Sequence, residues 1–287
     1  MPSTIAVRPR DLVSPPLLYG TAWKEERTES LVLQALQAGF RGLDTANQRK
    51  HYFEAAVGQA LAIAEQRGIV RREQVFLQTK FTFRAGQDQR LPYDSAARVA
   101  DQVRQSFVSS LEHLRTDYLD SYLLHGPSRR NGLGPEDLEA WHAIEQLRAS
   151  GKARYIGVSN VSVEQLRLLA EQSHILPSFV QNRCYAATGW DRECRAYCEQ
   201  TGIVYQGFSL LTANRRELQR PIVARIAKRL RVTPAQVVFA FAQRVGMLPL
   251  TGTTNPLHMK QDLESTELLF EPADLAALSE LDTPTSA

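Results

Sequence analysis

Eight short apolar runs alternate with longer stretches of helical character along this chain. The runs are rich in β-branched and aromatic residues, and they begin near Leu17, Phe40, Val75, Tyr118, Tyr155, Phe179, Ile203 and Met247. Several are apolar at successive positions, which is typical of parallel strands that are covered on both faces. The alternation therefore predicts repeated strand–helix units built around a parallel sheet.

The predicted helices have recognisable ends. Ser162 with Gln165 forms a capping-box pattern, and Thr233 is followed by Pro234 at the first helical position. A glycine closes the helical pattern just before a strand at four places, namely Gly39, Gly151, Gly202 and Gly246. These boundaries leave short links between the elements, and no change of composition interrupts the pattern.

We therefore predict an α/β chain that folds as one (β/α)8 barrel, with residues 1–287 forming a single domain. The alternative is a doubly wound parallel sheet divided between two domains. In a (β/α)8 barrel the catalytic side chains lie at the carboxyl ends of the strands, so those positions decide the function.

Composition limits the possible partners. The 287 residues carry 34 Lys plus Arg against 31 Asp plus Glu, a formal net charge of +3, which is too small a bias to indicate a nucleic acid. No apolar stretch approaches the roughly 20 residues that span a membrane, and the amino terminus lacks the apolar segment of a signal peptide. With a sparse, odd set of cysteines (Cys184, Cys194 and Cys198), this predicts a cytoplasmic protein. We expect a monomer, and we expect no metal site because the histidines are dispersed.

Asp44, Lys80 and His125 each follow a predicted strand, and Tyr52 comes shortly after the second one. Taken singly, such residues are more typical of a loop cap, a solvated side chain or a turn. A barrel brings its strand ends onto one rim, however, so we expect the four side chains to converge there.

These residue types suit the reduction of a carbonyl group. A carbonyl oxygen that accepts hydride gains negative charge and needs a proton donor. The phenol of Tyr52 has an ordinary pKa of about 10, and we expect the Lys80 ammonium to lower that pKa. Asp44 would hold Lys80 in place, and His125 would orient and polarise the carbonyl through a hydrogen bond.

The sequences around these residues resemble the aldo-keto reductase superfamily in order and content. GFRGLDTA precedes Tyr52, and LQTKF, LEHLRTDYLDSYLLHGP and GVSN follow it, within a resemblance that extends from about Leu17 to Leu281. The resemblance implies a barrel that reduces aldehydes or ketones with NADP(H). It also implies a catalytic tetrad, with the tyrosine as proton donor, that consists of Asp44, Tyr52, Lys80 and His125.

The resemblance further implies cofactor contacts at several strand ends. Ser159, Asn160 and Gln181 would bind the nicotinamide carboxamide, and the ring of Phe208 would stack on the nicotinamide. The other implied cofactor contacts are Thr21, Asp44, Ser209, Leu211, Thr251, Thr253, His258 and Asp262. The expected substrate is a small carbonyl compound, with contacts from Trp23 and His125. The chain has no G-x-G-x-x-G or Walker A pattern that would indicate a different nucleotide site.

Some positions depart from the family pattern. Leu250 stands where a lysine often grips the 2′-phosphate of NADP, and His258 stands at a downstream arginine position. NADP(H) is still the expected cofactor, with NAD(H) as the alternative. The segment before Tyr52 is longer than usual, which makes His51 a competing candidate for the acid. Gly126 replaces the bulky residue that often follows the catalytic histidine, and this predicts an open substrate pocket.

Two functions of other classes remain open. The first is a cofactor-binding regulatory barrel with little turnover, like the β-subunits of channels. The second is a barrel of unrelated chemistry, such as an isomerase or a metal-dependent hydrolase.

Overall fold

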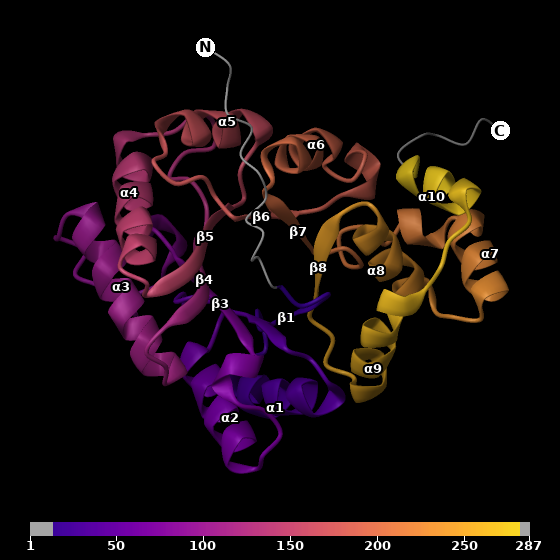
Figure 1. The fold of residues 1–287 in the computed structure, drawn as a ribbon, viewed down its shortest axis with the longest axis horizontal. Helices are drawn as coiled ribbons and strands as arrows, with labels where there is room; N and C mark the ends of the chain where they lie inside the picture. The colour runs from indigo at the N-terminus through magenta and orange to yellow at the C-terminus, as the bar shows by residue number, and fades with distance from the viewer. Residues whose placement is uncertain (1–13, 282–287) are drawn as a thin grey trace.

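In the computed structural model, which describes residues 14–281, eight parallel strands close into a barrel with helices around it (Figure 1). The strands are β1 (Leu18–Gly20), β2 (Gly42–Asp44), β3 (Phe76–Phe81), β4 (Leu119–Leu124), β5 (Ala153–Ser159), β6 (Phe179–Arg183), β7 (Val204–Phe208) and β8 (Met247–Thr251). Each strand pairs with the next along the chain, and β8 pairs with β1 to close the barrel. The predicted (β/α)8 fold is confirmed, and the doubly wound alternative is wrong because that sheet would be open.

The helices lie outside the strands (Figure 1). They are α1 (Thr28–Ala38), α2 (Glu54–Gln66), α3 (Val99–Leu114), α4 (Pro135–Ala149), α5 (Val163–Gln172), α6 (Arg192–Thr201), α7 (Pro221–Leu230), α8 (Pro234–Arg244), α9 (Pro256–Glu264) and α10 (Pro272–Ser279). Within residues 14–281, no helix has the length and apolar character needed to cross a membrane.

Local sequence signals set the helix ends as predicted. The Ser162 hydroxyl accepts a hydrogen bond from the Gln165 backbone N–H at the start of α5, and Thr233 caps α8 in the same way. Gly39 adopts a φ of +114° directly after α1, a backbone conformation that strongly favours glycine. These caps satisfy backbone groups that each helix end would otherwise leave unpaired.

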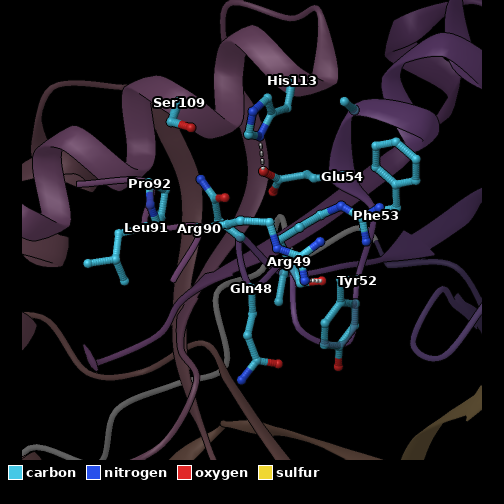
Figure 2. A pocket seen from close by; sticks show the side chains of 13 residues that line it. Gln48, Arg49, Tyr52, Phe53, Glu54, Arg90, Leu91, Pro92, Ser109 and His113 are labelled. Atoms are coloured by element: carbon cyan, nitrogen blue, oxygen red, sulfur yellow. Dashed lines mark hydrogen bonds and ion pairs between the residues drawn. The ribbon is translucent and has the colours of Figure 1, made fainter. Parts of the chain in front are cut away.

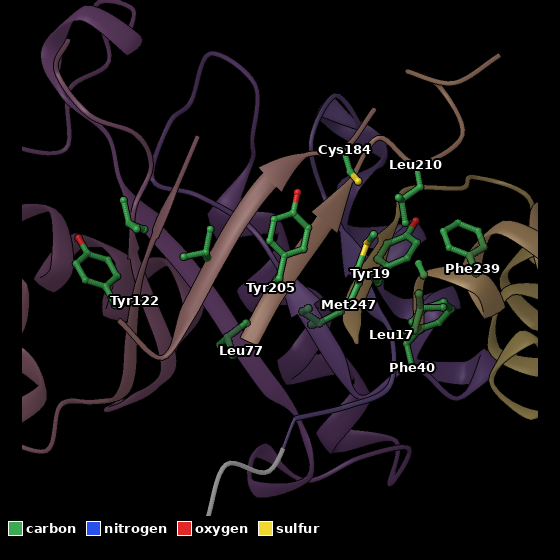
Figure 3. Packing of buried hydrophobic residues seen from close by; sticks show 14 of the residues in the cluster. Leu17, Tyr19, Phe40, Leu77, Tyr122, Cys184, Tyr205, Leu210, Phe239 and Met247 are labelled. Carbon is green, nitrogen blue, oxygen red and sulfur yellow. The ribbon is translucent and has the colours of Figure 1, made fainter. Parts of the chain in front are cut away.

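The apolar core has two parts because successive side chains of a strand point to opposite faces. The larger part lies between barrel and helices, and Figure 3 shows Tyr205 and Met247 from the strands with Phe239 from α8. The smaller part lies inside the barrel and includes Leu18, Phe76, Leu123, Phe179, Val204, Leu248 and Leu250. Polar side chains take over from this inner cluster towards the carboxyl ends of the strands, where the candidate site begins.

Candidate active site

A buried ion pair lies at the carboxyl ends of β2 and β3. Lys80 Nζ is 2.6 Å from Asp44 Oδ1, and it also donates to the backbone carbonyl of Thr45 at 2.8 Å. Lys80 is fully buried, and burial lowers the pKa of its ammonium while the Asp44 carboxylate opposes that shift. The two side chains therefore hold each other in place.

Tyr52 lies beside this pair, in the segment between β2 and α2. Its ring centroid is 5.5 Å from Lys80 Nζ and 5.8 Å from the centroid of the His125 ring. The structure thus brings Asp44, Tyr52, Lys80 and His125 together, as the sequence predicted. The competing candidate, His51, does not line the cavity described below; its Nδ1 is 2.9 Å from Gln48 Oε1.

The electrostatic environment of Tyr52 differs from the expectation. Burial raises the pKa of the Tyr52 phenol, and the Asp44 charge raises it further. Lys80 was expected to lower this pKa, but its ammonium is bound to Asp44 and its positive charge is largely offset there. In this structure the phenol is therefore held in its protonated form.

His125 is a neutral imidazole in this setting. Burial lowers its pKa to about 3, and the Lys80 charge contributes to that shift. Its Nδ1 lies 2.7 Å from the hydroxyl of Thr82, which is almost completely buried. Sequence reasoning missed Thr82 because a threonine shortly after a strand carries no chemical signal of its own.

A cavity of about 490 Å³ opens beside these groups. Twelve of the residues predicted from the sequence line it, namely Trp23, Asp44, Tyr52, His125, Ser159, Asn160, Gln181, Phe208, Ser209, Leu211, Thr251 and Thr253. Leu250 lines it as well. One continuous space therefore connects the proposed proton donor with the end of β8.

Four predicted site residues do not line this cavity. Lys80 is fully buried in its ion pair with Asp44. The backbone N–H and hydroxyl of Thr21 both donate to the Asp44 carbonyl, so this buried side chain ties β1 to β2. Asp262 accepts a hydrogen bond from Thr251 at 2.7 Å, and burial raises its pKa to about 6. His258 is exposed on α9, and the structure gives it no contact with this space.

Three glutamine side chains support Asp44 from inside the barrel. Gln78 and Gln181 each donate to Asp44 Oδ1, at 2.7 and 2.9 Å, and both also donate to Gln206 Oε1. Gln78 and Gln206 were missed in the sequence, although each stands two positions before a predicted site residue, on the same face of its strand. Since both N–H groups of the Gln181 amide are engaged, this residue offers its oxygen to the cavity side.

The carboxyl end of β5 is also held by hydrogen bonds. The Ser159 hydroxyl donates to the backbone carbonyl of Gln181 at 2.7 Å, and Asn160 Nδ2 donates to the backbone carbonyl of His125 at 2.8 Å. Asn160 therefore also keeps its amide oxygen free. Two acceptor oxygens at Asn160 and Gln181, with the partly buried ring of Phe208 nearby, suit an amide-bearing aromatic group such as nicotinamide.

A second cavity of about 350 Å³ shares Tyr52 with the first. It contains the ion pair between Glu54 and His113, whose Oε2 and Nδ1 atoms are 3.1 Å apart (Figure 2). Figure 2 shows the Tyr52 hydroxyl pointing away from both of these side chains. The acidic group of the tyrosine is therefore separate from the Glu54–His113 pair.

Comparison with known proteins identifies a family that matches nearly the whole chain. The family model described as Aldo/keto reductase family matches residues 17–283. The aldo-keto reductase AKR2E4 of Bombyx mori is 30% identical over 281 residues, covering 92% of this chain and 86% of the relative. The methylglyoxal reductase DkgA of Yersinia pestis is 27% identical over 258 residues, covering 90% of this chain and 84% of that protein.

A solved structure of the Bombyx mori protein in complex with NADP superimposes with a TM-score of 0.80 and 25% identity, covering 97% of this chain and 94% of that one. This similarity extends over nearly all of the closed barrel found here. The match of the family model over nearly the whole chain shows that this protein belongs to the aldo/keto reductase family.

Proposed function

We propose that this protein reduces small aldehydes or ketones with NADP(H), and that Tyr52 donates the proton. The observation that carries the proposal is the convergence of Tyr52 and His125 above the Asp44–Lys80 pair, at the wall of an open cavity. The nicotinamide, when bound, supplies the hydride. The protein must then orient the carbonyl, stabilise its developing charge and deliver one proton.

The raised pKa of the Tyr52 phenol suits a group that must hold its proton until the carbonyl needs it. Burial and Asp44 keep the proton on the phenol across the physiological pH range. A carbonyl that has received hydride becomes an alkoxide, which is a stronger base than a phenolate, so the proton moves only once hydride transfer has begun. Lys80, 5.5 Å from the ring centroid, then stabilises the tyrosinate that remains.

His125 is suited to hold the carbonyl oxygen. When the Thr82 hydroxyl donates to Nδ1, the neutral imidazole carries its hydrogen on Nε2 and can donate it to the substrate. Because the pKa of His125 is lowered to about 3, the ring gives a hydrogen bond without becoming a competing acid near neutral pH.

The substrate end of the cavity is open. Trp23 is 67% exposed and packs against His51, with ring centroids 4.0 Å apart and the rings tilted by 37°. A Cβ added at Gly126, next to His125, would meet no atom closer than 3.5 Å, so glycine is not required there by a close contact. We propose that Trp23 forms one wall for the substrate and that the pocket accepts compounds of varied shape.

The cavity offers little positive charge to bind the 2′-phosphate of NADP(H). Among residues 14–281, Lys24 is the one lysine or arginine that lines the cavity, and its Nζ donates to the Gly252 carbonyl at 2.9 Å. Burial lowers the pKa of Lys24 to about 8, which leaves the ammonium mostly charged at neutral pH. Leu250 supplies no charge for a 2′-phosphate.

The first experiment is therefore a fluorescence titration of the protein with NADPH and with NADH. Consumption of NADPH with a nitrobenzaldehyde as substrate is measured next.

Leu250→Lys tests the missing phosphate contact. A charge pair at about 4 Å is worth roughly 1 kcal/mol in water and about 4 kcal/mol near a protein surface. Since about 1.4 kcal/mol corresponds to tenfold in affinity, we expect the ratio of NADPH affinity to NADH affinity to rise about tenfold. Leu250→Met is the control of similar length without charge. An equal ratio in the lysine and methionine variants would show that the 2′-phosphate does not reach this position.

The cysteines bear on the proposed cytoplasmic location. Cys184, Cys194 and Cys198 are free thiols and all are buried. Unpaired thiols in the folded chain support a reducing compartment. Fractionation of the native host cells, followed by detection of the protein with a specific antibody, is the corresponding measurement.

A further inference from the structure

Two histidines and a glutamate meet on the outer surface of the barrel. His142 and Glu145 lie three residues apart on α4 and therefore share a face of that helix. His174 comes from the segment between α5 and β6. One ligand atom from each of the three side chains lies within 4.8 Å of the others, and the two imidazole centroids are 5.3 Å apart.

Glu145 is a carboxylate that is only 5% exposed. Its Oε1 accepts hydrogen bonds from the backbone N–H groups of His174 and Ile175, both at 2.7 Å. Its Oε2 lies 3.3 Å from His174 Nδ1, and within residues 14–281 no lysine or arginine pairs with it. A buried carboxylate is costly unless it is paired or hydrogen-bonded. The two backbone bonds fix Oε1 and leave Oε2 as the oxygen facing the histidines.

The end of α5 adds negative charge to this place. His142 Nε2 lies 3.3 Å from the carbonyl oxygen of Gln172, the last residue of α5. Carbonyl groups at a helix carboxyl terminus carry partial negative charge. Two imidazoles, a carboxylate and a helix carboxyl terminus together form an environment that favours a cation.

We propose that His142, Glu145 and His174 bind one divalent cation of the zinc class and thereby fasten α4 to the segment that enters β6. Two imidazole nitrogens and one carboxylate oxygen suit zinc, cobalt or nickel better than magnesium or calcium, which prefer oxygen ligands. Water would fill the fourth position. Ligand atoms of a tetrahedral zinc site lie roughly 3.4 Å apart, given bond lengths of about 2.0 to 2.2 Å. The ligand atoms here lie within 4.8 Å of one another, and the His174 side chain, which is 80% exposed, can rotate to bring them closer.

The sequence predicted no metal site because its histidines are dispersed. His174 lies 29 residues after Glu145, and only the packing of α4 beside the α5–β6 link brings the two together. The link leads into the amino end of β6, so the cation would lie away from the catalytic rim at the carboxyl ends. We therefore expect it to affect stability and not turnover.

The test uses the full chain, stripped of metal with EDTA and then titrated calorimetrically with ZnCl₂. We expect one Zn²⁺ per chain, a higher melting temperature with zinc, and no comparable response to MgCl₂. Reductase activity should be the same with zinc and with EDTA.

His174→Ala should weaken zinc binding about tenfold or more, because one of three protein ligands is lost. The His174 side chain is mostly exposed, so the melting temperature of His174→Ala in EDTA should match that of the parent protein. His142→Ala removes the other imidazole ligand and should weaken zinc binding as well. The control is His113→Gln, which alters the other buried glutamate–histidine pair, where no second imidazole is present. The proposal fails if zinc does not bind, if both alanine variants bind it as tightly as the parent, or if Cys194→Ser is the substitution that abolishes binding.

Discussion

The hydroxyl of Thr82 lies 2.7 Å from His125 Nδ1 and leaves Nε2 as the ring nitrogen available to a substrate. A threonine here orients the imidazole ring without adding charge to a crowded site. Thr82 thus acts through His125 as a positioning residue.

Thr82→Val removes this hydrogen bond while nearly preserving side-chain volume. We expect kcat to fall about tenfold, equivalent to roughly 1.4 kcal/mol, near the upper end for a neutral hydrogen bond. The Kd for NADPH should remain unchanged, and Thr82→Ser should restore most of the rate. If Thr82→Val changes only KM, or if Thr82→Ser does not restore kcat, the Thr82 side chain contributes packing and not this hydrogen bond.

The Asp44–Lys80 pair gives a stability prediction. Lys80→Met leaves a buried carboxylate with amide donors but no cation, and removal of one partner of such a pair costs about 3 to 5 kcal/mol. Unfolding in urea would measure the loss. The double variant Lys80→Met with Asp44→Asn should recover a large part of it, since the uncompensated charge is then gone. If the double variant is no more stable than Lys80→Met, charge burial is not the cause.

At the level of single residues, sequence reasoning found the groups with distinctive chemistry. Asp44, Lys80 and His125 stood out because charged side chains are costly to bury at barrel strand ends unless they are paired. Gln78 and Thr82 did not, since neutral polar side chains occur everywhere in loops and strands. Their roles depend on partners from other strands, which only the closed barrel identifies.

Among the elements, the start of α2 is tied to the end of α3. Glu54, the first residue of α2, accepts a hydrogen bond from the Thr79 hydroxyl at 2.5 Å and pairs with His113 of α3 at 3.1 Å. The pair anchors the helix that directly follows Tyr52. It therefore stabilises the segment that carries the proposed proton donor.

This pair makes stability depend on pH. The Glu54 hydrogen bond raises the pKa of His113, with a smaller contribution from the Glu112 charge. The folded chain therefore holds the proton more tightly than the unfolded chain, whose histidine pKa is about 6.5. This stabilisation is fully present below about pH 6.5 and is lost as the pH rises through the folded value. The free energy of unfolding of the parent minus that of His113→Gln should fall across this window, and a difference independent of pH would contradict the assignment.

Element boundaries were well predicted because their signals are local. The predicted starts of the strands lie within two residues of those in the structure, and the caps at Ser162 and Thr233 form as expected. Such signals depend on backbone hydrogen bonds within a few residues. The pKa of Tyr52 was predicted with the wrong sign because it depends on how deeply the side chain is buried and on where the Lys80 charge is already engaged.

On the scale of the whole molecule, closure of the barrel is what creates the site. The tetrad comes from the ends of three consecutive strands, β2, β3 and β4, and from the link between β2 and α2. These positions carry Asp44, Lys80, His125 and Tyr52, respectively. Because β8 pairs with β1, Thr251 and Thr253 line the same cavity as Trp23. An open sheet would separate the two halves of this site.

The most direct test of this arrangement is single-turnover reduction of a nitrobenzaldehyde by Tyr52→Phe with NADPH. Loss of the phenol proton should slow hydride transfer by about 10² to 10⁴, the usual contribution of a positioned acid, while the Kd for NADPH stays within about twofold. His51→Ala, which alters the neighbouring titratable group, should keep most of the rate. A Tyr52→Phe variant that turns over near the parent rate, or a His51→Ala variant that loses it, would contradict the account.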